Sequence, residues 1–141
     1  LIAVPVLAHN GSWLTWLGGD YNEISRLSQT FTVPVGTSVL HYWYWSASED
    51  DCLNDYFRIK VNTTTIYTRN LCIATNTGGW VEASINLAAY ANTSITLMFE
   101  VTTNSSLNSN LFLDDVSLSS TLLTSPEVVL PGGSGEESVV R

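Results

Sequence analysis

Residues 26–34 read RLSQTFTVP, and this stretch decides the fold class. Positions 27, 29, 31 and 33 are Leu, Gln, Phe and Val, whereas positions 28, 30 and 32 are Ser, Thr and Thr. Because successive side chains of a β-strand point to opposite faces, this alternation predicts a strand with one buried and one exposed face. Pro34 and Gly36 directly after it predict a turn.

The same period of two recurs along most of the chain. Residues 55–62 read DYFRIKVN, in which Tyr, Arg and Lys alternate with Phe, Ile and Val. Further runs of this kind occur at residues 38–46, 65–69, 80–87, 94–103 and 110–119. About eight strands at this spacing, separated by Gly, Asn, Ser and Thr turns, predict an all-β, antiparallel two-sheet sandwich.

Charge and hydropathy exclude two classes of partner. The formal net charge is −8, and the chain contains 5 Lys and Arg residues against 13 Asp and Glu residues. Nucleic-acid binding requires clustered cations, so no nucleic-acid partner is expected. The longest apolar run, residues 1–8, is too short to span a bilayer, so no membrane insertion is expected either.

The two ends depart from the strand pattern and divide the chain into three parts. Residues 1–10 form an apolar N-terminal strand or assembly segment, residues 11–120 the sandwich, and residues 121–141 a C-terminal extension or linker rich in Gly and Ser. Residues 1–8 are apolar on both faces, so they either form a strand of their own sheet or bind a neighbouring subunit. The lack of an initiator Met predicts a processed product or an excised domain.

Cysteines and glycosylation motifs indicate the compartment. Cys52 and Cys72 lack a CxxC spacing and a nearby His, which argues against zinc and leaves either a disulfide or two buried thiols. Glycosylation motifs begin at Asn10, Asn62, Asn92 and Asn104. Together with the scarcity of Lys, these features indicate an extracellular or cell-surface protein.

Several stretches resemble a known group of domains. They are LGGDYNEISRLSQTFTVP, LHYWYWSASEDDCLNDYFRIKV, the pair LC at residues 71–72, GGWVEASINLAAYANTSITLMFEV and NSNLFLDDVSL. From residue 11 to residue 118 the chain resembles the MAM-like and carbohydrate-binding-module-like jelly rolls of bacterial secreted multidomain proteins. This resemblance implies a galactose-binding-like two-sheet jelly-roll sandwich, and it does not imply catalysis.

The resemblance also implies one structural calcium, with Asp114 among its ligands. Asp114 and Asp115 are adjacent, so on a regular strand they point to opposite faces and share an ion only if the strand bulges. The alternative is that Asp114 accepts hydrogen bonds from the backbone of a neighbouring loop. A second acidic group, at positions 49, 50, 51 and 55, is either a loop calcium site or a set of turn residues.

Residues 41–45 read HYWYW and contain the candidate ligand-binding residues. His41, Trp43 and Trp45 share one strand face, and Tyr42 and Tyr44 share the other. A sandwich strand must bury one of these rows. Because phenol groups can reach water, we predict that Tyr42 and Tyr44 face outward as a contact surface for glycans or proteins, and that the Trp row is core.

Sequence patterns argue against an enzyme. The chain has 2 His residues and none of the GxSxG, HExxH or phosphate-binding glycine motifs. Glu82 and Glu100 are a chemically possible carboxylate pair, but both also fit outward positions of alternating strands. The leading hypothesis is a non-enzymatic cell-surface subunit, structural, adhesive or filament-forming, that self-associates or binds other surface proteins through its terminal segments. The alternative is a carbohydrate-binding accessory module of a larger secreted protein.

Overall fold

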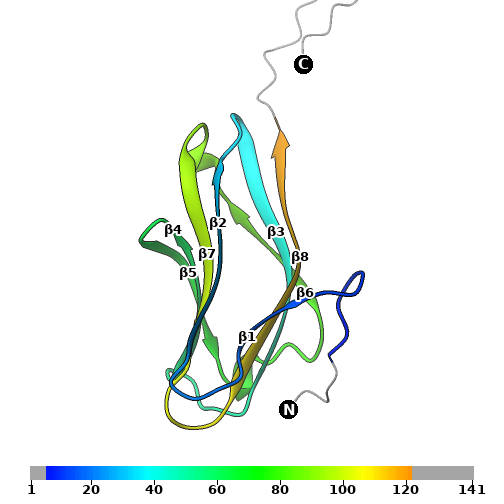
Figure 1. Cartoon of the computed structure of the whole chain (residues 1–141), viewed down its shortest axis with the longest axis vertical. Helices are drawn as coiled ribbons and strands as arrows, with labels where there is room; N and C mark the ends of the chain where they lie inside the picture. The colour runs from blue at the N-terminus through cyan, green and yellow to red at the C-terminus, as the bar shows by residue number, and fades with distance from the viewer. Residues whose placement is uncertain (1–5, 122–141) are drawn as a thin grey trace, which may run out of the picture.

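The computed structural model describes residues 6–121, which form a sandwich of two antiparallel four-stranded sheets (Figure 1). In chain order the elements are β1 (Thr15–Gly18), β2 (Ile24–Thr32), β3 (Thr37–Ser48), β4 (Asp55–Val61), β5 (Thr64–Leu71), the 3-10 turn η1 (Ile73–Thr75), β6 (Val81–Asn86), the 3-10 turn η2 (Ala88–Tyr90), β7 (Ser94–Thr102) and β8 (Ser109–Thr121). Sheet A has the order β1-β8-β3-β6, and sheet B has the order β2-β7-β4-β5. The predicted all-β sandwich is confirmed. Residues 1–5 and 122–141 lie outside the described residues, and with them half of the predicted N-terminal segment and nearly all of the predicted C-terminal extension.

The core lies between the inward faces of the two sheets. Strand β4 shows the pattern most clearly, because Asp55, Phe57, Ile59 and Val61 are buried while the residues between them are half-buried. Sheet A contributes mainly Leu40, Tyr42, Tyr44, Leu111 and Leu113, and sheet B mainly Phe57, Ile59, Leu97, Phe99 and Val101. Burial of these apolar side chains provides the main favourable free energy of folding.

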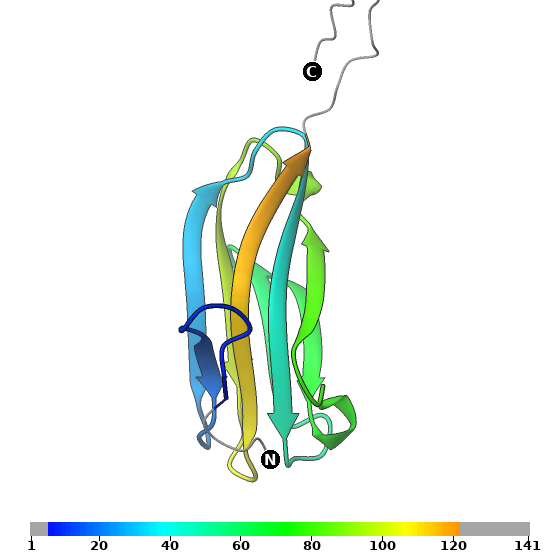
Figure 2. The ribbon, with the colours of Figure 1, turned by 90° about the vertical axis from the view of Figure 1, so that its right-hand side faces the viewer.

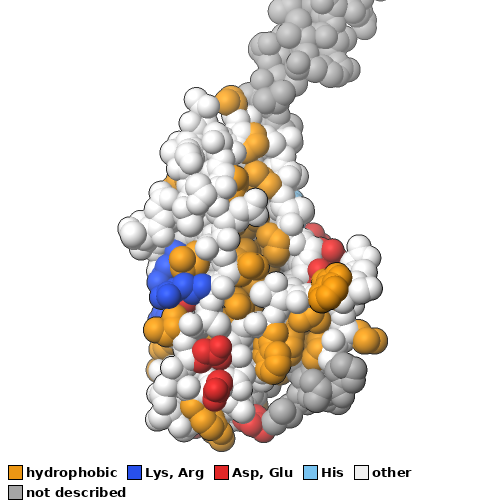
Figure 3. All heavy atoms as spheres, viewed as in Figure 1, with side chains coloured by type: hydrophobic (Ala, Val, Ile, Leu, Met, Phe, Trp, Pro, Cys, Tyr) orange, Lys and Arg blue, Asp and Glu red, His pale blue; other side chains and the backbone are white. Residues whose placement is uncertain are grey.

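Strand β2, which contains most of the stretch that indicated the fold class, is an edge strand and remains largely exposed. Beside it, β1 pairs only with Asn110–Leu113 of β8, so the rest of this edge of β8 has no strand partner among the described residues. An apolar groove of about 410 Å³ therefore opens along the seam between β2 and β8, lined by residues that include Leu27, Phe31 and Val116. Figure 3 shows hydrophobic side chains along this seam.

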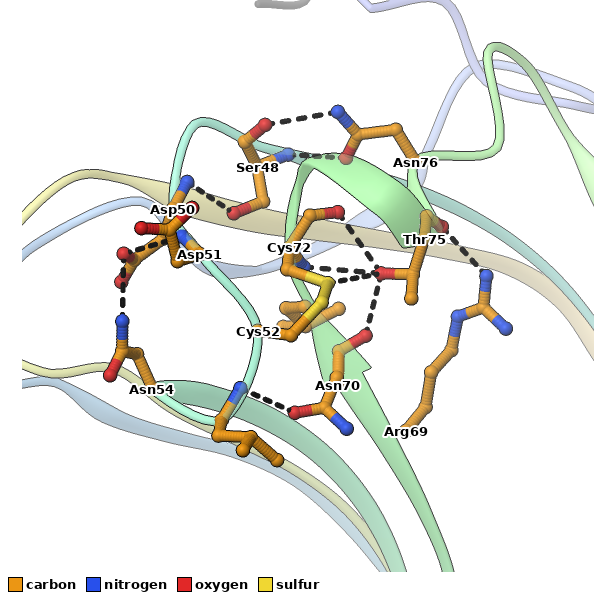
Figure 4. Close-up of a disulfide and its surroundings, with 12 residues drawn as sticks. Ser48, Asp50, Asp51, Cys52, Asn54, Arg69, Asn70, Cys72, Thr75 and Asn76 are labelled. Carbon is orange, nitrogen blue, oxygen red and sulfur yellow. Dashed lines mark hydrogen bonds between the residues drawn. A yellow bond between two sulfur atoms is a disulfide. The ribbon is translucent and has the colours of Figure 1, made fainter.

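A disulfide joins Cys52, in the loop after β3, to Cys72, directly after β5, with a Cα–Cα distance of 4.9 Å (Figure 4). The disulfide alternative is thus confirmed, and the alternative of two buried thiols is wrong. The Thr75 hydroxyl reinforces the same turn, because it accepts a hydrogen bond from the Cys72 backbone N–H at 3.1 Å and donates to the Asn70 carbonyl at 2.7 Å.

The outer face of sheet B has a buried charge cluster. The Glu100 carboxylate is 3% exposed and contacts Arg26 Nε at 2.8 Å and Lys60 Nζ at 2.8 Å. Burial raises the pKa of Glu100, but hydrogen bonds and charge from Lys60 and Arg26 outweigh burial and hold this pKa below its ordinary value. Glu100 is therefore ionised at neutral pH and ties β7 to its neighbours β2 and β4.

No helix among residues 6–121 is long and apolar enough to cross a membrane.

Candidate functional site

Tyr42 and Tyr44 face the core, so the prediction that they face outward is wrong. Tyr42 is 1% exposed and Tyr44 is 7% exposed. Strand β3 lies in the interior of sheet A, and its even-numbered face packs on sheet B, where the Tyr42 ring meets Phe57 and Phe99 at centroid distances of 6.3 and 5.4 Å. Burial raises the pKa of Tyr42, so its phenol is neutral. Neither tyrosine can offer a ring face to a ligand.

The Trp row lies on the outer face of sheet A and forms part of a line of rings across the strands. The register places Trp16 of β1 opposite Phe112 of β8, and Phe112 opposite Trp45 of β3. Trp16 stacks on Phe112 at a centroid distance of 5.8 Å, and Trp45 meets Trp80 edge-on at 6.1 Å. We call Trp16, Phe112, Trp45 and Trp80 the aromatic row.

The exposure of the aromatic row is uneven. Trp16 is 57% exposed, Trp45 and Trp80 are half-buried, and Phe112, which lies between Trp16 and Trp45 in the register, is buried. The Trp16 indole donates a hydrogen bond to Asn110 Oδ1 at 3.0 Å, which fixes its orientation. Gly19 has a φ of 95° and lets the ring lie against the backbone, since a Cβ at this position would come within 2.6 Å of the indole.

Residues 6–14 cross the outer face of sheet A and complete this surface. The His9 ring stacks on Trp43 at 3.8 Å, and the Leu7 carbonyl accepts a hydrogen bond from Trp80 Nε1 at 3.1 Å. Figure 2 shows the N-terminal chain in front of this sheet, near β8. The segment thus covers Trp43 and fixes the indole of Trp80. The described part of residues 1–8 contacts its own domain here, whereas residues 1–5 lie outside the described residues.

Asp114 and Asp115 lie at a β-bulge, and both contact the N-terminal segment at His9 and Asn10. The register of β3 and β8 shifts between His41 and Trp43, and Asp115 has a φ of 47°. The Asn10 N–H donates to Asp114 at 3.1 Å, and His9 Nδ1 lies 2.7 Å from Asp115 Oδ2. The strand bulges here, which is the condition under which the two acids could share an ion, and Asp114 accepts a backbone hydrogen bond from the Asn10 loop, as the alternative predicted. The calcium ligand role of Asp114 stays a prediction.

The acidic loop divides into exposed and buried members. Glu49 and Asp51 are exposed, whereas Asp50 is 2% exposed and Asp55 is 0% exposed. Asp50 Oδ1 accepts hydrogen bonds from the Asp51 N–H at 2.7 Å and from Asn54 Nδ2 at 3.0 Å (Figure 4). The turn interpretation therefore holds for Asp50 Oδ1, but it does not explain why two of these carboxylates are buried.

The predicted glycosylation sites lie in turns. Asn10, Asn62 and Asn92 are exposed, and Asn104 is half-buried. Asn62 Oδ1 accepts the Thr96 N–H at 2.9 Å, and Asn104 Oδ1 accepts the Ser106 N–H at 2.9 Å. Glycosylation at all four positions stays a prediction.

Two groupings of residue types that occur in active sites can be located in the structure. Glu82 lies on β6 of sheet A and Glu100 on β7 of sheet B, so they cannot flank one bond. His41 lies 3.0 Å from Ser119 Oγ and 3.6 Å from Glu82 Oε1, a grouping that the sequence did not suggest because the register of three strands creates it. These side chains lie on the outer face of sheet A, beside the bulge between β3 and β8 and the edge strand β6.

No family model matches this chain, and no curated protein matches it by sequence. Among solved structures, the chain is similar to TmCBM61, a carbohydrate-binding module determined in complex with β-1,4-galactotriose. The two chains are 16% identical, the match covers 82% of this chain and 75% of that chain, and the TM-score is 0.57. At this identity the likeness shows a shared sandwich fold. It does not show membership of the MAM-like group.

Proposed function

We propose that this domain is a non-catalytic carbohydrate-binding module that acts outside the cell or at its surface. Its fold is shared with TmCBM61, whose structure contains a galactotriose, and its disulfide suits an oxidising compartment. This was the alternative hypothesis from the sequence. The fold likeness supports it better than it supports an adhesive or filament-forming subunit.

The aromatic row is the observation that carries this proposal. Pyranose rings stack on exposed aromatic faces through their C–H groups, and polar side chains beside the rings bind hydroxyls. The row crosses three strand intervals, and at about 4.8 Å per interval its length is about 14 Å. A surface of this length suits a chain of several sugar units better than a single sugar, with Asn110 as a hydrogen-bonding partner beside Trp16.

The charge of the surroundings favours a neutral ligand. Glu82, Asp114 and Asp115 lie on the same sheet as the aromatic row, and the whole chain has a net charge of −8. Carboxylates on the same sheet repel uronic acids and sulfated sugars. We therefore propose neutral polysaccharides as the ligand class.

Loss of a ring from the row is expected to weaken binding without unfolding the domain. Trp16→Ala and Trp80→Ala should each raise the dissociation constant for a bound neutral polysaccharide at least about tenfold, which corresponds to about 1.4 kcal/mol. Isothermal titration calorimetry against a panel of neutral and anionic polysaccharides measures this. Trp16 is 57% exposed, so its removal should leave the melting temperature nearly unchanged.

Trp13 provides a matched control, because it is 87% exposed and lies outside the row. Trp13→Ala should bind as tightly as the unsubstituted protein. If no polysaccharide binds, or if Trp13→Ala and Trp16→Ala weaken binding equally, the aromatic row is not the binding surface.

The groove between β2 and β8 favours a second candidate function, self-association. Its floor is apolar, and one edge of β8 beyond Leu113 has no strand partner among residues 6–121. We propose that an apolar strand of a second copy adds to this edge. Val116 is 42% exposed in the groove lining, so Val116→Lys should convert oligomers to monomers. Light scattering over a range of concentrations measures this, and a protein that stays monomeric at high concentration excludes the proposal.

A further inference from the structure

A buried polar layer closes one end of the sandwich. The inward face of sheet A ends in Ser48 and Ser109, which are 5% and 0% exposed. Opposite them on sheet B, Asp55 is 0% exposed and Thr103 is 9% exposed. The loop after β3 adds Asp50, which is 2% exposed. Polar side chains thus replace the apolar core at this end, which is costly unless each polar atom has a partner.

Two carboxylates in this layer lack a complete set of partners. Asp55 Oδ1 accepts the Asn104 N–H at 2.8 Å, and Asp50 Oδ1 accepts its two hydrogen bonds from the turn. The second oxygen of each, Oδ2, is buried without any hydrogen-bond donor. Asn108 Oδ1, in the loop that leads into β8, is also buried without a donor.

Hydrogen bonds link Asp50 to Ser48 and Ser109, and Ser109 reaches the strand partner of Asp55. The Asp50 N–H donates to Ser48 Oγ at 2.9 Å, and Ser48 Oγ lies 2.8 Å from Ser109 Oγ. Ser109 Oγ donates to the Leu71 carbonyl at 3.4 Å, and Leu71 is the strand partner of Asp55.

Loop contacts join the same parts of the chain. The Glu49 N–H donates to the Asn108 carbonyl at 2.9 Å, and Asn54, next to Asp55, donates to Asp50. The loop between β3 and β4 and the loop between β7 and β8 therefore contact each other at this end of the sandwich, and each contains a residue with an unpartnered buried oxygen.

Among residues 6–121, no salt bridge reaches this layer. The salt bridges of the described residues involve Asp115, Glu82 and Glu100, and none reaches Asp50 or Asp55. Buried carboxylates are retained when they are paired or when they coordinate a metal. The unpartnered atoms here are all oxygens, which are the ligands of hard divalent cations.

We propose that Asp50 Oδ2 and Asp55 Oδ2 bind one calcium ion at this end of the sandwich. Asn108 Oδ1, carbonyl groups and water would supply further oxygens toward the six to eight that calcium takes. Asp50 and Asp55 would supply two carboxylates, and no group of three or more His, Cys, Asp or Glu side chains suited to a metal occurs among residues 6–121. Calcium sites of extracellular modules often have dissociation constants of about 0.1–1 mM. We expect a dissociation constant in this range, because the site has a low negative charge.

This site is separate from Asp114. Asp114 lies at the β8 bulge on the outer face of sheet A, where it accepts the Asn10 N–H. A calcium ion at Asp50 and Asp55 would instead join the loop that carries Cys52 to the loop that leads into β8. Its role would be to stabilise the fold at this end of the sandwich.

Calcium titration of the complete chain tests the proposal. After removal of metals with EDTA and dialysis, calorimetric titration with CaCl2 should give one site per chain. At about 10 mM calcium the melting temperature should rise by about 5 °C over the EDTA sample, since a ligand that binds only the folded state stabilises it. Magnesium at the same concentration should have a smaller effect, because it demands stricter octahedral geometry.

Four Asp→Asn variants locate the ion. Asp50→Asn and Asp55→Asn keep an acceptor oxygen but lose the charge, so each should abolish the calcium-dependent shift. Both should melt in EDTA at or above the temperature of the unsubstituted protein, because a buried unpaired charge is removed. Asp51→Asn is the matched control, since Asp51 is exposed on the same loop, and it should retain the shift. Asp114→Asn should also retain it.

Three results would overturn the proposal. The first is that the unsubstituted protein does not bind calcium, and the second is that magnesium raises the melting temperature as much as calcium does. The third is that the calcium-dependent rise in melting temperature is lost in Asp114→Asn but kept in Asp55→Asn. Calcium titration of the unsubstituted protein tests the proposal even if Asp50→Asn and Asp55→Asn both fail to fold. In the case of no binding, buried water would be the partner of these oxygens.

Discussion

Tyr42→Ala is expected to lower the free energy of unfolding by about 3–5 kcal/mol, the cost typical of removing a large buried ring. Tyr42 is 1% exposed and meets Tyr44, Phe57 and Phe99 at centroid distances of 5.9, 6.3 and 5.4 Å. Its removal would leave a cavity between the two sheets, which relaxation fills only in part. Chemical denaturation followed by tryptophan fluorescence measures the change.

Tyr56→Ala is the matched control for this experiment. Tyr56 lies on β4, one residue before Phe57, and its half-buried ring packs under the Arg58 guanidinium at 4.6 Å. The alternation of β4 directs this ring away from the core, so its loss should cost no more than about 1 kcal/mol. Equal destabilisation by Tyr42→Ala and Tyr56→Ala would contradict the assignment of Tyr42 to the core.

The burial of Tyr42 shows what strand periodicity can and cannot predict. Alternation in residues 41–45 correctly separated Tyr42 and Tyr44 from Trp43 and Trp45. It did not reveal which row faces inward, because that depends on which face of sheet A meets sheet B. The prediction that the phenol groups of Tyr42 and Tyr44 reach water was wrong, because both tyrosines pack in the core beside Phe57.

The aromatic row required information that lies outside any single strand. Trp16, Phe112 and Trp45 come from three strands, and the antiparallel register alone aligns them. The bulge at Asp114 and Asp115 likewise depends on how β8 matches β3. Sequence patterns predict which residues form strands, whereas a binding surface that crosses strands depends on their order and register.

The acidic loop shows a different limit of sequence reasoning. Asp and Asn in SEDDCLND are typical turn residues, and Asp50 does bind the turn backbone through Oδ1. Asp50 and Asp55 are buried beside the loop that precedes β8, and the Asn104 N–H of that loop, which donates to Asp55, lies 49 residues later in the chain. Spacing alone therefore does not distinguish a solvated turn from a buried pair of carboxylates.

Loss of the disulfide is expected to be the second large effect on stability. The Cys52–Cys72 bond closes a loop with a sequence separation of 20, and the chain-entropy model gives about 3 kcal/mol for a loop of this length. The double variant Cys52→Ala, Cys72→Ala should therefore unfold at a lower denaturant concentration. The dependence of its free energy of unfolding on denaturant concentration should become steeper, because the unfolded chain exposes more surface without the cross-link.

Two comparisons separate the cross-link from the hydrogen bonds of the same turn. Thr75→Val removes the hydroxyl that bonds to the Cys72 N–H and the Asn70 carbonyl but keeps the disulfide, so it should cost only about 1–3 kcal/mol and leave the slope unchanged. Reducing agent should destabilise the unsubstituted protein and Thr75→Val but not the double Cys variant. If reduction left the midpoint of the unsubstituted protein unchanged, the hydrogen bonds would stabilise this turn without help from the cross-link.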